Sequence, residues 1–339
     1  MDVDEKSISI VMKRRKFINQ MGVGVAATVV PHTWISFKTA SENKPTKELK
    51  FGIITDVHKD LIPDADERLE KFIKEASKRK VDFIIQLGDF CFADPKNLGF
   101  MDIWNSFKGP KYHVLGNHDM DRNSKPEMLE FLGMPKTYYS YDIGGYHFVV
   151  LDANFLHREG KYIDYKNANF YVDSNERTYI NDEQIKWLKT DLEATKLPTI
   201  VFSHQSLWHY QWGVKNRLEI QKVMEAHSDK IICCMNGHNH IDFHHHQNGI
   251  DYVEVNSASY QWMSDKYTST ERFPKKYYKE YGNLPHIAAY KDPLYAFATL
   301  NAKGTLQIDG VKSDWLSPSP YDLGRPKAMY GSEATAEMS

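Results

Sequence analysis

Short apolar runs alternate with amphipathic segments along the chain from Leu49 onward. The apolar runs have the length and the β-branched and aromatic content of strands, and they span residues 49–55, 81–87, 111–115, 198–203 and 230–236. Helices are predicted where apolar positions recur every three or four residues: 65–79 with Leu69, Phe72, Ile73 and Ala76, then 181–195 and 217–226. Asp64 or Asp66 is expected to cap the first of these helices. The alternation predicts an α/β fold, with sheet between layers of helices.

Two hairpins and a tail complete the predicted organisation. Gly144 and Gly145 separate two strand-like runs, and Asn248 and Gly249 separate two more, as two-residue hairpin turns do. From about residue 312, Pro, Ser and Gly dominate the sequence. We therefore expect one domain over residues 46–312, followed by a tail over residues 313–339 that wraps the surface or is disordered.

The first 45 residues read as an export signal and linker. A basic group containing Arg14 and Arg15 precedes an apolar run from Met21 to Val30. This run is too short for a membrane span, which needs about 20 apolar residues, but it suits an export signal. The segment resembles a twin-arginine signal, which implies a periplasmic or extracellular protein, with cleavage after Ala40 as one option. The alternative is a basic amphipathic arm that the protein retains.

Composition excludes several classes of protein. Lys and Arg number 43 and Asp and Glu 45, so no general positive field attracts nucleic acid, and no stable nucleic-acid partner is expected. The chain has three cysteines, of which Cys233 and Cys234 are adjacent, so no disulfide framework is predicted. The 15 histidines are the more informative count.

Polar side chains follow the predicted strands at the point where each strand ends. Loops at the carboxyl ends of strands in an open α/β sheet converge at one edge, where binding sites form. Five such loops carry carboxylate, amide or imidazole groups: Asp56 and His58; Asp89; Asn117, His118 and Asp119; His204; and His238 and His240.

Metal ions account for this mixture of side chains. Oxygen and imidazole donors without cysteine suit Mn, Fe or Zn ions rather than a structural thiolate zinc site. Seven of the residues are candidate ligands: Asp56, His58, Asp89, Asn117, His204, His238 and His240. That number exceeds what one ion needs while it also binds substrate, so we expect two divalent or mixed-valence ions. Asp89 is the expected bridge, because the glycine before it allows a close approach.

The same loops resemble the calcineurin-like metallophosphoesterases, whose blocks run D-x-H, G-D, G-N-H-D/E, H and G-H-x-H. All five blocks occur in order between Leu49 and Val255. The resemblance implies a four-layer α/β/β/α fold, a mixed β-sandwich flanked by helices. It also implies that Asp56, His58, Asp89 and His240 hold one ion, and that Asp89, Asn117, His204 and His238 hold the other.

Catalytic roles follow from this resemblance. His118 is left free of metal and is expected to donate to the leaving group or to stabilise developing charge. Asp119 is expected to hold the other ring nitrogen of His118. A hydroxide that bridges the ions would attack phosphorus in line, in a phosphomonoester, a phosphodiester or a nucleotide-type diphosphate.

Two aromatic-rich segments, residues 153–179 and 259–292, are expected to contribute to a substrate lip, as are Trp208, Tyr210 and Trp212. Ordinary surface packing is the alternative. The hairpin at residues 138–154 resembles the branch with manganese-dependent ADP-ribose and CDP-alcohol diphosphatases, although that branch has Gln where this chain has His58. The implied partner is a small phosphate ester, a nucleotide in that branch. A metal-dependent nuclease and a non-catalytic scaffold on the same fold are the competing hypotheses.

Overall fold

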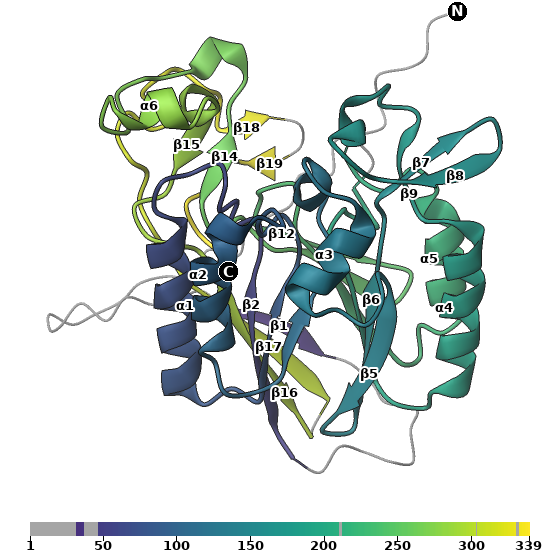
Figure 1. The fold of residues 1–339 in the computed structure, drawn as a ribbon. Helices are drawn as coiled ribbons and strands as arrows, with labels where there is room; N and C mark the ends of the chain where they lie inside the picture. Colours follow the sequence, from purple (N-terminus) through teal and green to yellow (C-terminus); the bar gives the residue numbers. More distant parts are fainter. Residues whose placement is uncertain (1–31, 37–46, 210–211, 303, 330–331) are drawn as a thin grey trace, which may run out of the picture.

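The computed structural model describes residues 32–36, 47–209, 212–302, 304–329 and 332–339. Two six-stranded mixed sheets form its centre (Figure 1). The first has the order β1 (His32–Ser36), β17 (Thr305–Gly310), β16 (Ala296–Asn301), β2 (Leu49–Ile54), β3 (Phe83–Gln86) and β4 (Lys111–His113). The second has the order β12 (Phe243–Gln247), β13 (Ile250–Glu254), β11 (Ile231–Asn236), β10 (Thr199–Ser203), β6 (Tyr146–Leu151) and β5 (Tyr139–Ile143).

Strands that precede the polar loops run parallel within each sheet. In the first sheet β2 pairs with β3 and β3 with β4 in parallel, and in the second sheet β6, β10, β11 and β13 are parallel neighbours. Both predicted hairpins are present, with Gly144 and Gly145 between β5 and β6 and with Asn248 and Gly249 between β12 and β13. The parallel pairs bring the predicted loops to one edge of each sheet.

The two sheets pack face to face through aromatic side chains. Phe51 and Phe83 of the first sheet both meet Phe148 of the second, with ring centroids 5.8 and 5.1 Å apart. These residues belong to one buried cluster that draws members from both sheets. Burying the inner faces of two sheets against each other removes apolar area from water and fixes their separation.

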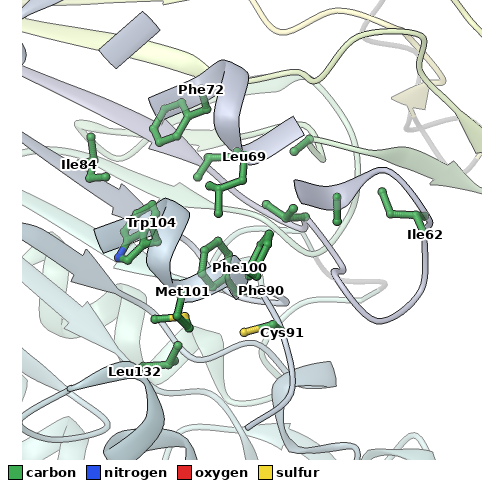
Figure 2. Packing of buried hydrophobic residues seen from close by; sticks show 14 of the residues in the cluster. Ile62, Leu69, Phe72, Ile84, Phe90, Cys91, Phe100, Met101, Trp104 and Leu132 are labelled. Atoms are coloured by element: carbon green, nitrogen blue, oxygen red, sulfur yellow. The ribbon is translucent and has the colours of Figure 1, made fainter. Parts of the chain in front are cut away.

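Helices cover the outer faces of both sheets. On the first sheet lie α1 (Ala65–Arg79) and α2 (Leu98–Asn105), and on the second lie α4 (Asp182–Ala194) and α5 (Arg217–Glu225) (Figure 1). Leu69 and Phe72 of α1, Trp104 of α2 and Ile84 of β3 meet in one cluster (Figure 2). Ile84 and Ile85 therefore face opposite layers, as the period of a strand requires. The four-layer α/β/β/α fold is confirmed.

Smaller elements surround the loop edge of the sandwich. They are α3 (Lys125–Leu132), a three-stranded sheet of β7 (Phe155–Arg158), β8 (Lys161–Asp164) and β9 (Arg177–Tyr179), and a pair formed by β14 (Tyr260–Trp262) and β15 (Ile287–Ala289). Near that pair lie α6 (Tyr277–Glu280) and a short hairpin of β18 (Ala328–Met329) and β19 (Ser332–Glu333). Figure 1 shows β7 to β9 and the β14–β15 region on opposite sides above the sandwich.

Two local expectations need correction or extension. The residue before α1 is Asp64, but its side chain makes no cap and instead accepts hydrogen bonds from Arg68 at 3.0 and 2.8 Å, while Asp66 pairs with Lys59. The C-terminal segment, expected to wrap the surface or to be disordered, inserts Met338, fully buried, into the core between the sheets. Its backbone N–H donates to the carbonyl of Val311 at 2.9 Å.

Within residues 1–45, expected to be an export signal and linker, the structure places β1, which pairs antiparallel with β17 from His32↔Asp309 to Ser36↔Thr305. The basic group and the apolar run of the expected signal lie outside the described residues. None of the helices in the described part of the chain has the length and apolar character of a membrane span.

Candidate metal centre

The structure gathers the predicted ligands at the loop edge of the two sheets. Asp56 follows β2 and Asp89 follows β3, while His204 and His240 follow β10 and β11. His204 Nε2 lies 3.1 Å from Asp89 Oδ2 and 3.9 Å from Asp56 Oδ1, and His240 Nε2 lies 3.1 Å from Asp56 Oδ1. Residues almost two hundred positions apart therefore meet at one point.

Two groups of three side chains could each hold an ion. One is Asp56, His58 and His240, and the other is Asp89, His204 and His238; within each group one donor atom from every residue lies within 4.8 Å of the others. The groups adjoin, because His58 Nε2 is 3.7 Å from Asp89 Oδ2. Asn117 is buried beside them, and the N–H of the next residue, His118, donates to Asp89 Oδ1 at 2.7 Å.

Atoms that can bind a metal face one another in the first group. His240 Nδ1 is 2.6 Å from the carbonyl oxygen of Tyr260, which can only accept, so Nδ1 carries the proton and Nε2 presents a lone pair. That lone pair faces Asp56 Oδ1 at 3.1 Å and His58 Nε2 at 3.3 Å. A metal ion could bind all three of these atoms, so the residues fit a bound metal.

His204 shows the same arrangement in the second group. Its Nδ1 donates to the carbonyl of Leu87 at 2.7 Å, which points Nε2 toward the carboxylates. Nε2 lies 3.1 Å from Asp89 Oδ2 but without hydrogen-bond geometry, and it is buried with no other partner. Backbone carbonyls thus fix the orientation of imidazoles in both groups, as they commonly do around metal-binding histidines.

Burial and neighbouring charges set the ionisation of these groups. Burial lowers the pKa of His58 and of His238 to about 3, so both imidazoles are neutral, as metal ligation requires. Burial opposes the ionisation of Asp89, but His204 and His118 hold the pKa of that carboxyl well below its usual range. Burial would also lower the pKa of His204, yet Asp89 and Asp56 outweigh it and raise that pKa to about 9. The two carboxylates therefore favour a positive charge at His204 Nε2, which either a proton or a metal ion can supply.

The backbone adopts an unusual conformation at five of the candidate ligands. Their φ angles are positive, between 51° and 67°, a region that residues other than Gly rarely occupy: Asp56, His58, Asp89, His238 and His240. Two of the motif glycines have no room for a side chain, since a Cβ on Gly116 would overlap Asp89 and one on Gly237 would overlap Thr55 and Asp56. The motifs thus combine donors with the backbone shape that lets them converge.

His118 is oriented by Asp121, and the expectation that Asp119 would do this is wrong. His118 Nδ1 is 2.8 Å from Asp121 Oδ2, and the hydroxyl of Tyr171 donates to the same carboxylate oxygen at 3.3 Å. His118 and Asp121 stand three residues apart across a short 3-10 helix, His118–Met120, and a period of three residues places them on one side. Burial would lower the pKa of His118, but Asp89 and Asp121 raise it to about 9.

Asp119 instead joins two of the ligand loops. Its carboxylate oxygens accept the backbone N–H groups of Phe90 and Gly116, both at 2.7 Å. One of these residues follows Asp89 directly and the other precedes Asn117. Asp119 therefore holds the loop after β3 against the loop after β4, which is a structural task rather than a catalytic one.

A cavity of about 340 Å³ opens onto the metal centre. Asp89, His118 and His238 form its inner end. The remaining lining is mainly aromatic and cationic and includes Phe170, Arg177, Trp212, Trp262, Tyr267 and Arg325. Its volume is within the range of small-molecule sites.

Some of the aromatic residues expected at a substrate lip line the cavity, and Trp208 does not. Phe170, Trp212, Trp262 and Tyr267 line the cavity. Trp208 does not: it stacks on Phe243 and lies against His245 of β12, with ring centroids 5.2 and 4.0 Å apart. Tyr210 lies outside the described residues.

Sequence reasoning missed several residues around the centre. Asp121, Arg177 and Arg325 belong to none of the five blocks, and only the spacing of three residues between His118 and Asp121 could have indicated a pairing. Glu254 is also buried near the site, and it accepts a hydrogen bond at 3.0 Å from Asn239, which lies between His238 and His240.

The double sheet carries two adjoining carboxylate and imidazole groups at its loop edge, beside the half-buried His118 and a cavity, and this arrangement is that of a metal-dependent phosphoesterase. The chain belongs to the calcineurin-like phosphoesterase family, whose model matches residues 49–242. It is 25% identical over 266 residues to the manganese-dependent ADP-ribose/CDP-alcohol diphosphatase of Oryza sativa subsp. japonica, covering 59% of this chain and 79% of that protein.

Solved structures of low identity share the fold. A dimetal phosphatase from Danio rerio aligns with a TM-score of 0.53 at 16% identity, over 79% of this chain and 99% of that one. GAP50, described as the anchor in the inner membrane complex of Plasmodium, aligns with a TM-score of 0.51 at 15% identity, over 80% of this chain and 86% of that one.

Proposed function

We propose that this phosphoesterase cleaves a phosphate ester or anhydride bond in a small, nucleotide-type substrate. Two ions would be held by the residues gathered at the loop edge: Asp56, His58, Asp89 and His240 for one, and Asp89, Asn117, His204 and His238 for the other. The observation that carries the proposal is the position of His204 Nε2, which is buried 3.1 Å from Asp89 Oδ2 and 3.9 Å from Asp56 Oδ1 and has no hydrogen-bond partner. When bound, such ions neutralise phosphoryl oxygens and lower the pKa of water between them.

The protein's own contribution centres on His118. It lines the cavity beside Asp89, and its Nδ1 is engaged by Asp121, which leaves Nε2 as the nitrogen that can reach a substrate. A raised pKa keeps this imidazole protonated at neutral pH. His118 is therefore suited to donate a proton from Nε2 to the oxygen of the departing group, while Asp121 stabilises the cationic ring.

The substrate class rests on two supports. The rice relative is named for the hydrolysis of ADP-ribose and CDP-alcohols. In this chain the cavity beside the candidate ligands carries the aromatic side chains of Phe170, Trp212 and Trp262, which offer flat apolar faces to a base or a similar ring.

A substrate screen tests the proposal. The purified protein is stripped of metal, loaded with Mn, Fe or Zn in turn, and offered 4-nitrophenyl phosphate, bis(4-nitrophenyl) phosphate, ADP-ribose and a single-stranded oligonucleotide. We expect hydrolysis of ADP-ribose with at least one metal and no turnover by Asp89→Asn. A protein that binds two ions and hydrolyses none of these compounds contradicts the proposal, and preferential cleavage of the oligonucleotide supports the nuclease hypothesis instead.

We also propose that the protein is exported, on the strength of the resemblance of residues 1–30 to a twin-arginine signal. Cleavage after Ala40 would remove β1, which pairs with β17. N-terminal sequencing of secreted material checks this: an end before His32 would keep the strand, and a full-length Met1 end would count against export.

A further inference from the structure

We propose that Arg177 binds the phosphate group that is not attacked, so that the site selects compounds with two linked phosphates over simple monoesters. This inference rests on the proposed function, because it places a second anion next to the one at the metal centre. It concerns a residue outside the five motif blocks, on a strand of the small sheet formed by β7, β8 and β9.

Arg177 lies one aromatic ring outward from the catalytic end of the cavity. The ring of Phe170 has its centroid 5.9 Å from that of His118 and 6.3 Å from that of His238. The guanidinium of Arg177 lies over the same ring, 4.1 Å from its centroid, and Nη1 donates to the carbonyl of Phe170 at 2.9 Å. All four residues line the cavity, so the guanidinium of Arg177 is held close to the place where a phosphoryl group would be attacked.

The charge of Arg177 is not neutralised by the protein. Across the described residues, no carboxylate forms a salt bridge with it, whereas Arg158 on the neighbouring strand β7 is paired with Glu176 at 2.6 Å. A guanidinium has five N–H donors in a planar fork, and that fork matches the oxygens of a phosphate. A half-buried arginine with donors to spare, in a cavity that ends at a metal centre, suits a phosphate ligand.

The backbone holds Arg177 in place by a strained connection. The register between β7 and β9 shifts so that Leu156 opposes Arg177 and Phe155 opposes Tyr179, which leaves Thr178 as an extra residue. Thr178 has a φ of 70°, which is rare for a β-branched residue, and its N–H donates to the buried hydroxyl of Tyr165 at 2.7 Å. Bulges of this kind redirect a neighbouring side chain near functional sites.

The aromatic side chains near Arg177 indicate which chemical group would be joined to the second phosphate. Trp212 and Trp262 line the same cavity as Arg177, and Arg325 contributes a second buried guanidinium to its wall. An anion close to flat apolar faces fits a phosphate joined to a nucleoside better than a free inorganic ion. Nucleoside diphosphate compounds are therefore the substrate class that this end of the cavity would take.

The test compares two variants against two substrates. In Arg177→Gln we expect the KM for ADP-ribose to rise about 10- to 100-fold, because one charge-assisted contact is lost, while kcat/KM for 4-nitrophenyl phosphate stays within about twofold. Arg177→Lys keeps the positive charge but not the planar fork of donors, so its KM for ADP-ribose should lie between those of wild type and Arg177→Gln. Arg158 is in the same sheet but does not line the cavity, so Arg158→Gln should leave the kinetic constants for both substrates unchanged.

A binding measurement separates this proposal from the proposed function. Manganese-loaded protein is titrated by calorimetry with pyrophosphate and with orthophosphate, which needs no turnover. Wild type should bind pyrophosphate more tightly than orthophosphate. In Arg177→Gln the affinity for pyrophosphate should fall at least about tenfold, while the affinity for orthophosphate should change little. Equal losses for both anions, or no loss for either, would overturn the role of Arg177. Failure of wild type to hydrolyse any substrate would overturn only the proposed activity.

Discussion

His118, which lines the cavity, is hydrogen-bonded to Asp121, and its Nδ1 lies 2.8 Å from Asp121 Oδ2. The adjacent Asp119 turns the other way and accepts two backbone N–H groups. The two carboxylates, close in sequence, therefore have different roles. Asp121 orients a side chain that would act on the substrate, and Asp119 holds together the loops that carry the ligands.

Asp121→Asn should lower kcat about 10- to 100-fold, as the loss of an orienting partner commonly does. The amide can still accept from His118 but no longer favours its cationic form. The loss should be larger for a substrate with a poor leaving group than for 4-nitrophenyl phosphate, because only the former needs a proton. Asp119→Asn is the control: it should lower the free energy of unfolding by about 1–3 kcal/mol. If Asp119→Asn shows the leaving-group effect and Asp121→Asn does not, the assignment is wrong.

Removal of metal should abolish hydrolysis and destabilise the fold. Binding to the native state alone stabilises it by about 2.7 kcal/mol per site when the free ion is at one hundred times its Kd. Elemental analysis should find two ions per chain in the loaded protein, and fewer in Asp89→Asn, since Asp89 adjoins both groups. An unchanged melting temperature after chelation would argue that the gathered residues hold no ion.

Trp208 and Trp212 should separate stability from substrate binding. Trp208 packs on β12 and donates from Nε1 to Gln247 at 3.2 Å, so Trp208→Ala should cost about 2–4 kcal/mol of unfolding free energy and leave KM unchanged. Trp212 is 48% exposed and lines the cavity, so Trp212→Ala should raise KM about 3- to 10-fold with little effect on stability. Chemical denaturation and steady-state kinetics on both variants check this, and a KM effect in Trp208→Ala would contradict the packing.

His147 should make the fold more stable at acid pH than at alkaline pH. Burial would lower its pKa, but the hydrogen bonds to Asp191 and Asp142 outweigh this and raise the pKa above the ordinary 6.5. The stabilisation is then complete below about pH 6.5 and is lost as the pH rises through the folded-state pKa. The difference in unfolding free energy between wild type and His147→Gln should be larger at pH 6 than at pH 9. A difference that grows with pH would refute the charged pairing.

Lys125 should be among the residues most sensitive to substitution. Its ammonium is buried against Asp152, with Nζ and Oδ2 2.6 Å apart. Lys125→Met strands a buried carboxylate and should cost about 3–5 kcal/mol. Because that carboxylate also accepts from Asn154, which in turn accepts from Gln205 at 2.8 Å, the disturbance should spread toward the metal centre.

The double variant Lys125→Met with Asp152→Asn is the matched control for this pair. It removes both charges and keeps an acceptor for Asn154, so it should recover much of the lost unfolding free energy. A double variant no more stable than Lys125→Met would show that the buried charge is not the cause.

The sequence predicted that the candidate ligands would gather, because each one lies in the loop after a strand and the strand order brings those loops together. It could not predict the partner of His118, which depends on a single 3-10 turn that places Asp121 rather than Asp119 beside it. Nor did it indicate Arg177, which reaches the cavity through a bulge at Thr178, a feature with no local signal of Gly or Asn. β1 was missed because its pairing partner, β17, is almost three hundred residues away.

The left-handed backbone at Asp56, His58, Asp89, His238 and His240 has a consequence for how such proteins change. Left-handed backbone geometry costs roughly 1 kcal/mol or more for each residue with a side chain. Replacing one of these donors by glycine should therefore relieve backbone strain while it abolishes turnover. Descendants of this chain that lose these metal-binding residues would therefore become inactive without losing folding stability. An engineer who wants a passive scaffold of the same shape should begin at these five positions.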